Sequence, residues 1–499
     1  MSATELGHYV GGEARPGTSG NTGPVYNPAT GEQVASVALA SVAEVDAAVA
    51  VAKEAFDEWR TSSLATRSKL MFRLRELVHG NADELARRIS AEHGKVHSDA
   101  MGEVARAVEN IEYACNIGEL LRGDHSNQVS TGVDVTTVRR PLGVVAGITP
   151  FNFPGMVPLW MIPNAIACGN TFVLKPSEKD PSSSLYLAEL VTEAGFPPGV
   201  VNVVNGDKVA VDRILEHPDV AAVSFVGSTP IARYIHQTAS ANGKRVQALG
   251  GAKNHMVVLP DADIGLAADA AVSAGFGSAG ERCMAISVVV AVGSSADPLV
   301  DAIAARTEKL KIGAGDDPES EMGPLITREH RDRVAGYVGG AADAGATLVL
   351  DGRLEEFDSD GFFLGCSLVD HVTPEMSVYT DEVFGPVLSV VRVDTYDEAM
   401  DLLRANPYGN GTAIFTRDGG AARRFCEDAP VGMVGVNVPI PVPVAYHSFG
   451  GWKSSLFGDH SIHGMEGVRF YTKLKTVTSR WPSGVKEGAV FNFSGGSDV

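Results

Sequence analysis

The feature that most constrains the fold is a change of rhythm at Gly143, where short apolar runs begin to alternate with helical stretches. Each run is rich in strand-forming residues, whereas the stretches between the runs carry helical patterns. Such βαβ alternation is typical of a parallel sheet with helices on both faces. We therefore expect an α/β protein with a doubly wound sheet. Its strands are predicted at residues 144–149, 171–174, 200–204, 222–226 and 245–249.

A second α/β alternation follows Asn254 and predicts a second sheet. Upstream of both alternations, residues 41–121 have helical patterns that begin with Ser41 and Glu44 at the spacing of a capping box. The last of these upstream helices is predicted at residues 102–121. Further strands are predicted at residues 131–139, 256–259, 286–292, 386–393 and 432–438, and further helices at residues 265–277 and 327–344.

Composition and charge exclude several classes of function. The 499-residue chain has 41 basic and 61 acidic residues, and its net charge of −20 disfavours nucleic acid or an anionic membrane as a partner. Its five cysteines form no C-x-x-C pair, which is typical of a reducing compartment, and its 13 histidines lack the spacing of a metal site. The sequence shows no signal-peptide pattern and no apolar run of membrane-spanning length. We therefore expect a cytoplasmic enzyme without a metal.

The most reactive group that the sequence offers is the thiol of Cys283. It lies in the stretch Gly-Phe-Gly-Ser-Ala-Gly-Glu-Arg-Cys-Met, between a helical run and a strand-like run. The glycines give the backbone freedom to bring the thiol up to a ligand. The cation of Arg282 beside it favours the thiolate, which is the reactive form. A free cysteine is as often a small buried hydrophobe, so this stretch alone leaves both interpretations open.

Two predicted strand ends are candidates for nucleotide binding, although no G-x-G-x-x-G fingerprint follows a strand in the first alternation. Lys175 and Glu178 can hold the two hydroxyls of an adenosine ribose, but taken alone they fit a solvated surface pair better. Ser228 precedes Thr229 and Pro230 at a helix start whose free N–H groups can face a phosphate. A capped helix without a ligand explains this second turn equally well.

These motifs together resemble the aldehyde dehydrogenase superfamily, in the order that the superfamily has them. The matching stretches are Ile148–Pro154, Leu174–Glu178, Phe225–Thr229, Gly280–Cys283, Glu382–Pro386 and Asn406–Gly411. The resemblance implies a homotetramer whose subunits have three parts. These are an NAD-binding domain (residues 1–126 and 142–253), a catalytic domain (residues 254–445) and a small β oligomerisation element (residues 127–141 and 468–490).

The resemblance also implies roles for individual residues. Cys283 is implied as the nucleophile, and the oxyanion site as Asn152 with the Cys283 backbone N–H. A carboxylate at Glu178 would repel a 2′-phosphate, which favours NAD over NADP as the cofactor. The residues implied to bind NAD are Thr149, Phe151, Lys175, Glu178, Lys179, Ser228, Gly250, Glu382 and Phe384.

One departure from the superfamily pattern concerns the water-activating base. Hydrolytic members carry a glutamate in the motif Glu-Leu-Gly-Gly-Lys, and alignment on Lys253 puts Leu249 at that position. Leucine cannot accept a proton, so a general-base contribution of typically about 10²–10⁴-fold is missing there. We interpret this loss as a change of acyl acceptor from water to coenzyme A. Glu281 as a substitute base is the open alternative.

A narrower resemblance supports coenzyme A as the acceptor. It is to the CoA-acylating branch that acts on methylmalonate and malonate semialdehydes in valine or inositol breakdown. It implies NAD-dependent oxidation through a Cys283 thioester, with loss of CO₂ and release of propionyl-CoA or acetyl-CoA. Arg282 and Arg106 are implied to bind the substrate carboxylate, although Arg106 also fits an exposed helical arginine. A hydrolytic semialdehyde dehydrogenase that gives a free acid is the alternative. The matching stretches are Val246–Ala248, Gly251–His255, Glu281–Met284, Gly435–Pro443 and Phe470–Thr472.

Overall fold

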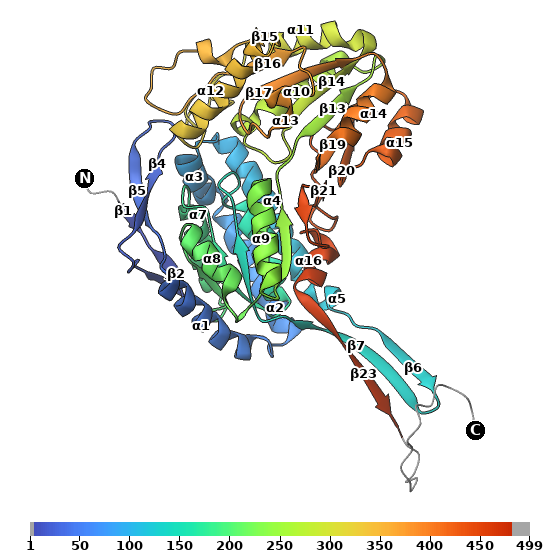
Figure 1. The fold of residues 1–499 in the computed structure, drawn as a ribbon. Coiled ribbons are helices and arrows are strands. Elements are labelled where there is room, and N and C mark those ends of the chain that lie inside the picture. The colour runs from blue at the N-terminus through green and yellow to red at the C-terminus, as the bar shows by residue number, and fades with distance from the viewer. Residues whose placement is uncertain (1–3, 482–499) are drawn as a thin grey trace.

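The computed structural model describes residues 4–481, which form two α/β units and a β arm that projects from them (Figure 1). The first unit contains an eight-stranded sheet, the second unit a seven-stranded sheet and the arm a three-stranded sheet. Within residues 4–481 no helix combines the length and the apolarity that crossing a lipid bilayer requires. A further small sheet lies near the amino terminus and consists of β1 (Thr4–Leu6), β4 (Thr22–Tyr26) and β5 (Gln33–Ala38).

The sheet of the first unit has five parallel strands at its centre, in the order β12-β11-β8-β9-β10. This confirms the predicted parallel sheet, whose strands have nearly the predicted bounds. Three short antiparallel strands extend this sheet, β2 and β3 beyond β10 and β22 beyond β12. Strand β22, which comes from near the end of the chain, was not predicted. The bounds are β2 (His8–Val10), β3 (Glu13–Arg15), β8 (Val144–Ile148), β9 (Thr171–Lys175), β10 (Val201–Val203), β11 (Val220–Val226), β12 (Arg245–Leu249) and β22 (Leu456–Phe457).

Helices cover both faces of this sheet, as a doubly wound fold requires, and a separate hydrophobic core lies on each face. Successive side chains of a strand point to opposite faces. Val145 accordingly packs with α2, α3, α4, α6 and α7, and Val144 packs with α1, α8 and α9. At the start of α1, Ser41 and Glu44 form the predicted capping box. The bounds are α1 (Val42–Trp59), α2 (Leu64–Gly80), α3 (Ala82–His93), α4 (His97–Cys115), α5 (Ile117–Leu120), α6 (Met156–Ala167), α7 (Ser182–Glu193), α8 (Lys208–Glu216) and α9 (Thr229–Ala241).

Helix α4 begins five residues before the helix that was predicted at residues 102–121, and it ends earlier. Its N-cap residue, Val96, makes no side-chain cap bond. Instead the N–H of His97 donates to the carbonyl of Gly315 in the second unit at 2.9 Å. This tertiary hydrogen bond satisfies an N–H of the first turn that has no partner within the helix. Local patterns could not predict it.

The sheet of the second unit confirms the predicted second α/β alternation. Its order is β15-β16-β17-β14-β13-β19-β20, and every neighbouring pair is parallel except β15 with β16. The strand bounds are β13 (Asn254–Val258), β14 (Ile286–Val292), β15 (Thr347–Leu350), β16 (Ser367–Asp370), β17 (Val387–Val393), β19 (Gly411–Phe415) and β20 (Met433–Val436). The helix bounds are α10 (Ile264–Phe276), α11 (Ala296–Thr307), α12 (Arg328–Asp343), α13 (Ser377–Thr380), α14 (Tyr396–Ala405) and α15 (Gly419–Asp428).

The β arm pairs a strand from the middle of the chain with one from near its end. Strand β23 lies antiparallel to β7 over nine residue pairs, and β6 is the other neighbour of β7 (Figure 1). Helix α16 (Gly464–Phe470) leads into β23, and β18 (Tyr408–Gly409) pairs with β21 (Trp452–Lys453) in a separate small ladder. Residues 1–3 and 482–490 of the expected domains lie outside the described residues. The arm strands are β6 (His125–Ser130), β7 (Val133–Pro141) and β23 (Thr472–Arg480).

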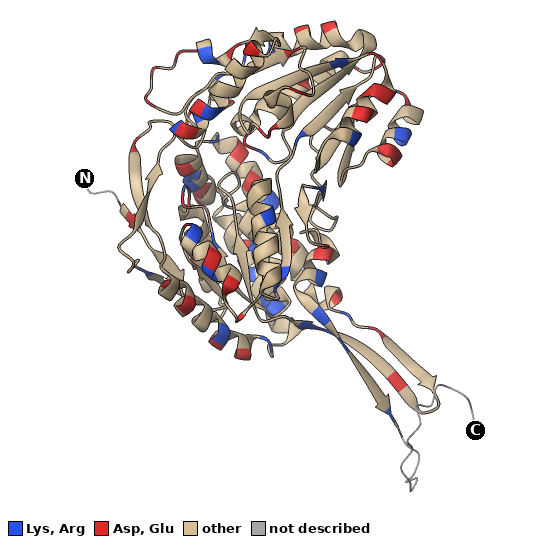
Figure 2. Ribbon diagram, in the orientation of Figure 1, with Lys and Arg blue, Asp and Glu red and all other residues tan. Residues whose placement is uncertain are grey.

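Charged residues are distributed over both units and the arm. Figure 2 shows acidic and basic residues interspersed along the helices rather than separated by sign. The acidic excess of the chain is therefore not gathered on one element of this view.

Candidate active site

Cys283 lies in the connection between α10 and β14, in the second unit. In the turn that follows α10, Ser278 and Ala279 have φ angles of 54° and 52°. Residues other than glycine rarely adopt this left-handed conformation, which costs roughly 1–3 kcal/mol each, and such strain is commonly found at functional sites. The Cys283 carbonyl accepts hydrogen bonds from the side-chain amides of Asn254 at 2.9 Å and Asn410 at 3.0 Å. These two amides fix the backbone of the thiol residue.

Cys283 lines a cavity of about 420 Å³ to which both units contribute. The first unit contributes the ends of its strands and the loops that follow them, which is where open α/β sheets bind ligands. Most of the site residues that the sequence predicted come together here. Those that line the cavity are Phe151, Asn152, Lys179, Ser228, Gly250, Cys283, Glu382 and Phe384.

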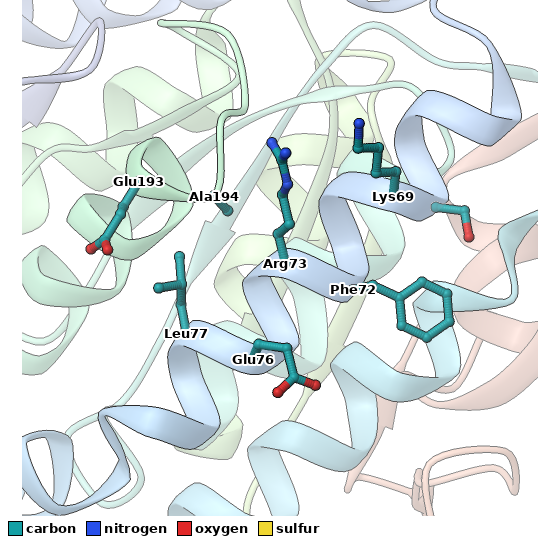
Figure 3. Close-up of a pocket in the computed structure, with 8 residues that line it drawn as sticks. Lys69, Phe72, Arg73, Glu76, Leu77, Glu193 and Ala194 are labelled. Atoms are coloured by element: carbon teal, nitrogen blue, oxygen red, sulfur yellow. The ribbon is translucent and has the colours of Figure 1, made fainter.

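A larger hollow of about 750 Å³ lies elsewhere, between α2 and the end of α7. Figure 3 shows Lys69, Phe72 and Arg73 of α2 at this hollow, with Glu193 and Ala194 from the end of α7. It is a broad and open surface feature, and none of the predicted site residues lines it. The smaller cavity at Cys283 is therefore the candidate active site.

Three of the predicted cofactor residues, Thr149, Lys175 and Glu178, are not among the lining residues of that cavity. The Thr149 N–H donates to the Lys175 carbonyl at 3.1 Å, so β8 and β9 end side by side. Lys175 is buried, and its ammonium contacts the Glu178 carboxylate at 2.8 Å. This buried lysine does not fit the surface-pair interpretation. Although burial acts in the opposite direction, Lys175 and Lys179 hold the pKa of Glu178 below its usual value, so the carboxylate stays charged.

The start of α9 has the free N–H groups that the sequence predicted. Ser228 is its N-cap, but the Ser228 hydroxyl makes no cap hydrogen bond, which differs from the expected hydroxyl cap. The Thr229 hydroxyl instead accepts from the Gly251 N–H at 2.9 Å. A Cβ added at Gly250 would lie 2.7 Å from the carbonyl oxygen of Ser454, so only glycine fits there. The cavity therefore has a helix N-terminus on one wall, which suits an anionic group such as a phosphate.

The expectation that Arg282 favours the Cys283 thiolate is wrong for this structure. The guanidinium of Arg282 lies 2.8 Å from the carboxylate of Asp99 on α4, which balances its charge. Burial raises the pKa of Cys283 to about 12, and the carboxylate of Glu382 acts in the same direction. The thiol form therefore predominates near neutral pH, because desolvation and a nearby anion both disfavour a second negative charge.

Arg106, the second arginine implied for the substrate, lies on α4 and is 45% exposed. Its guanidinium donates to both carboxylate oxygens of Glu109, at 3.0 and 3.1 Å. Arg106 follows Asp99 by seven residues, which places both on the same face of α4. The helix therefore carries Arg106 on the side where Asp99 meets Arg282, about two turns further along.

Two buried carboxylates lie near the thiol, and they differ in what they contact. Glu382 lines the cavity and accepts from the Ala252 N–H at 2.9 Å, and burial raises its pKa to about 7. Glu281, the open alternative as a base, is fully buried and does not line the cavity. Its oxygens lie 3.4 Å from His330 Nε2 and 3.7 Å from His93 Nε2, and burial raises its pKa to about 8. Glu281 therefore faces His93 and His330.

Several residues that line the cavity or support its walls were not predicted from the sequence. His330 and Arg333 of α12 line the cavity, and His330 Nε2 contacts the carbonyl of Phe384 at 2.6 Å. Lys95 is buried behind Asn152, whose carbonyl accepts from its ammonium at 2.6 Å. None of these residues belongs to a recognisable sequence motif, because each reaches the site through contacts between distant parts of the chain.

The sequence and the fold match a known family. The model of the aldehyde dehydrogenase family matches residues 15–477. The chain belongs to the aldehyde dehydrogenase family.

Several individual aldehyde dehydrogenase relatives are similar over nearly the whole chain. It is 54% identical to malonate-semialdehyde dehydrogenase of Pseudomonas aeruginosa over 480 residues, which cover 96% of each chain. A solved structure of methylmalonate-semialdehyde dehydrogenase from Oceanimonas doudoroffii is 57% identical, with a TM-score of 0.95 over 96% of this chain and 99% of that one. A Sinorhizobium meliloti protein solved in complex with NAD is 52% identical, with a TM-score of 0.96 over 98% of this chain and 100% of that one.

The raised pKa of Cys283 predicts how its alkylation depends on pH in the aldehyde dehydrogenase without nucleotide. Only the thiolate reacts, so below the pKa the iodoacetamide rate should rise about tenfold per pH unit, without a plateau between pH 7 and pH 9. Glu382→Gln removes an anion that raises this pKa, so it should speed the reaction above about pH 7, where the Glu382 carboxylate is charged, and have little effect well below that pH. Mass spectrometry of the Cys283 peptide measures the rate separately from the exposed Cys426. A rate that does not change from pH 7 to pH 9 would contradict the assignment.

Proposed function

We propose that this chain is an NAD-dependent, CoA-acylating dehydrogenase of malonate and methylmalonate semialdehydes. The observation that carries the proposal is a thiol and an amide, Cys283 and Asn152, in one cavity, together with a leucine at position 249, where hydrolytic members carry a glutamate. Leu249 is buried at the end of β12, directly before Gly250, which lines the cavity. The names of the two relatives above support the same substrates.

In this proposal the cavity and the adjoining strand ends of the first unit hold NAD. The residues present fit such a group, because the N–H groups at the start of α9 suit its phosphates. Glu178, beside Lys175, would bind the adenosine ribose hydroxyls and repel a 2′-phosphate. Glu382 and Phe384 would contact the nicotinamide side. The similar Sinorhizobium meliloti structure in complex with NAD supports this assignment.

The proposed reaction begins when the Cys283 thiolate adds to the aldehyde carbon and the carbonyl oxygen becomes an oxyanion. The Asn152 side-chain amide and the Cys283 backbone N–H donate to that oxyanion. The oxyanion then collapses, the C=O bond re-forms, and hydride leaves the carbon. NAD, when bound, accepts that hydride. The product on the enzyme is a malonyl-type thioester of Cys283.

Two further steps complete the proposed turnover. The substrate carboxylate leaves as CO₂, and its bonding electrons pass to the thioester as an enolate, whose oxygen the same two donors stabilise before the carbon takes up a proton. The thiolate of coenzyme A then attacks the thioester carbonyl and expels the Cys283 thiolate. The products are acetyl-CoA or propionyl-CoA. Water is a poor competitor because Leu249 cannot remove its proton.

The proposal includes the domain roles and the assembly that the resemblance implies. Residues 1–126 and 142–253 would form the NAD-binding domain, and residues 254–445 the catalytic domain. Residues 127–141 and 468–490 would join subunits into a cytoplasmic homotetramer. The described part of the β arm supports this role, because it exposes apolar side chains such as Leu474, which is 60% exposed.

The main test of the proposal is a product assay with coenzyme A present or omitted. With malonate semialdehyde, NAD and CoA, steady formation of NADH and acetyl-CoA is expected. Without CoA, NADH formation should stop after about one turnover per active site, because the acyl-enzyme accumulates. Cys283→Ser serves as the control, in which both phases should be lost. Steady release of a free acid without CoA would instead favour the hydrolytic alternative.

A second prediction concerns the substrate carboxylate. Arg282→Met should raise the KM for malonate semialdehyde about 10- to 100-fold, since a charge-assisted hydrogen bond typically contributes about 1.5–3 kcal/mol. The KM for propanal, which lacks the carboxylate, should change little. Arg106→Met should show a smaller effect of the same kind. Arg122→Met is the matched control, because Arg122 pairs with Glu119 at 3.0 Å, three residues away like Arg106 and Glu109, and has no implied role in substrate binding. Equal changes in both KM values would contradict the proposed role.

A further inference from the structure

Lys95 is a buried cation that contacts the segment carrying Asn152. Its side chain is 1% exposed, in the short connection between α3 and α4. Its ammonium contacts the carboxylate of Glu103 at 2.8 Å and donates to the backbone carbonyl of Asn152 at 2.6 Å. The ammonium also lies 4.3 Å from the centre of the Phe153 ring. The Lys95 ammonium therefore contacts Glu103 on α4 and two consecutive residues, Asn152 and Phe153, of the segment that carries the proposed oxyanion donor.

Glu103, the partner of Lys95, holds the other end of the same segment. One of its carboxylate oxygens accepts from the N–H groups of Gly155 and Met156, at 2.8 and 2.9 Å. These groups begin α6, whose N-cap makes no side-chain cap bond of its own. The first N–H groups of a helix lack partners within it, and a carboxylate there is favoured by the helix dipole. Glu103 thus caps α6 from a different helix.

The backbone around Lys95 packs tightly against the second unit. A Cβ added at Gly315 would lie 2.4 Å from the Lys95 carbonyl oxygen, and one at Gly323 would lie 2.0 Å from that of Gly94. Only glycine therefore fits at these two contacts. The neighbouring hydrogen bond from His97 to Gly315 joins the units at the same place. Lys95 is consequently fixed relative to the unit that carries the thiol.

We propose that Lys95 and Glu103 are positioning residues that hold Asn152 in register with Cys283, an inference that rests on the proposed oxyanion role of Asn152. Lys95 fixes the Asn152 carbonyl, and Glu103 fixes the start of α6 three residues later. The segment between these two points can then present its side-chain amide at one place. A buried ion pair is weak evidence for a role in stability, since apolar residues of similar size often serve as well. The contacts of the Lys95–Glu103 pair are instead concentrated on the segment that carries the Asn152 amide.

The test measures the pre-steady-state burst of NADH in Lys95→Met, in Asn152→Ala and in the variant that combines them. Lys95→Met should slow the burst about 10- to 100-fold, because a misplacement near 1 Å can cost this much. It should leave the Kd of NAD within about twofold, since the effect runs through the donor and not through the cofactor walls. In the Asn152→Ala background, the same substitution should change the burst by less than about twofold.

Lys244→Met is the matched control. Lys244 is also a buried lysine whose ammonium donates to two backbone carbonyls, those of His217 and Val220, but it lies outside the cavity. The burst of this variant should equal that of the unmodified protein. A comparable loss in Lys244→Met would show that removal of any buried lysine slows the burst, and would overturn the proposal.

A second variant covers the case in which Lys95→Met fails to fold, because that change leaves the Glu103 carboxylate buried without its partner. Lys95→Met combined with Glu103→Gln removes both charges, and the glutamine oxygen can still accept from the start of α6. The proposal expects the same slow burst, since the Asn152 carbonyl still lacks its ammonium. A burst at the unmodified rate would overturn it.

Different results contradict the oxyanion role of Asn152 and the positioning role of Lys95. If Asn152→Ala leaves the burst unchanged, the oxyanion role in the proposed function is wrong, and the inference drawn from it is wrong as well. If Asn152→Ala slows the burst but Lys95→Met does not, only the positioning role is overturned. The positioning role is also overturned if the losses in the combined Lys95→Met and Asn152→Ala variant simply multiply, because independent sites behave additively in free energy.

Discussion

Catalysis as proposed depends on the contact between the two α/β units, because the thiol belongs to one unit and the oxyanion amide to the other. The contact is polar and specific. The ammonium of Lys253 donates to the carbonyls of Val378 and Asp381, and the Ala252 N–H donates to the carboxylate of Glu382. Glycines at the junction allow backbones to meet without an intervening side chain. A small shift of one unit against the other would separate Cys283 from its proposed partner.

Burial disfavours the charged form of the ionisable groups around the thiol. It raises the pKa of Cys283 to about 12, of Glu281 to about 8 and of Glu382 to about 7, and it lowers that of Lys253 to about 8. Each shift disfavours the charged form, as desolvation does. Hydrogen bonds to a developing oxyanion are stronger in such surroundings than in water.

Local patterns predicted the parts of the fold that depend on local chemistry. The predicted strands at residues 245–249 and 286–292 have the bounds of β12 and β14, because their apolar runs end at turn-forming residues. The turn with Cys283 and the loop with Asn152 reach one cavity, as the resemblance to the aldehyde dehydrogenases implied.

What local patterns could not predict depends on residues that are distant in sequence. β22 joins the first sheet although it follows β12 by about two hundred residues, and no pattern in either strand specifies that pairing. The effect of Arg282 was misjudged because its partner, Asp99, lies on a helix far upstream. The Lys95–Glu103 pair has the same origin, since a lysine and a glutamate in helical surroundings ordinarily face solvent. These contacts become visible only when the tertiary structure places the residues together.

The central claim is that a thiol carrier, and not water, takes the acyl group from Cys283. Mass spectrometry of the Cys283 peptide tests it most directly, after the protein is mixed with NAD and malonate semialdehyde and quenched in acid. The account predicts an acylated Cys283 that persists while coenzyme A is absent and disappears when coenzyme A is added. An unmodified Cys283 together with free acid in solution would contradict it.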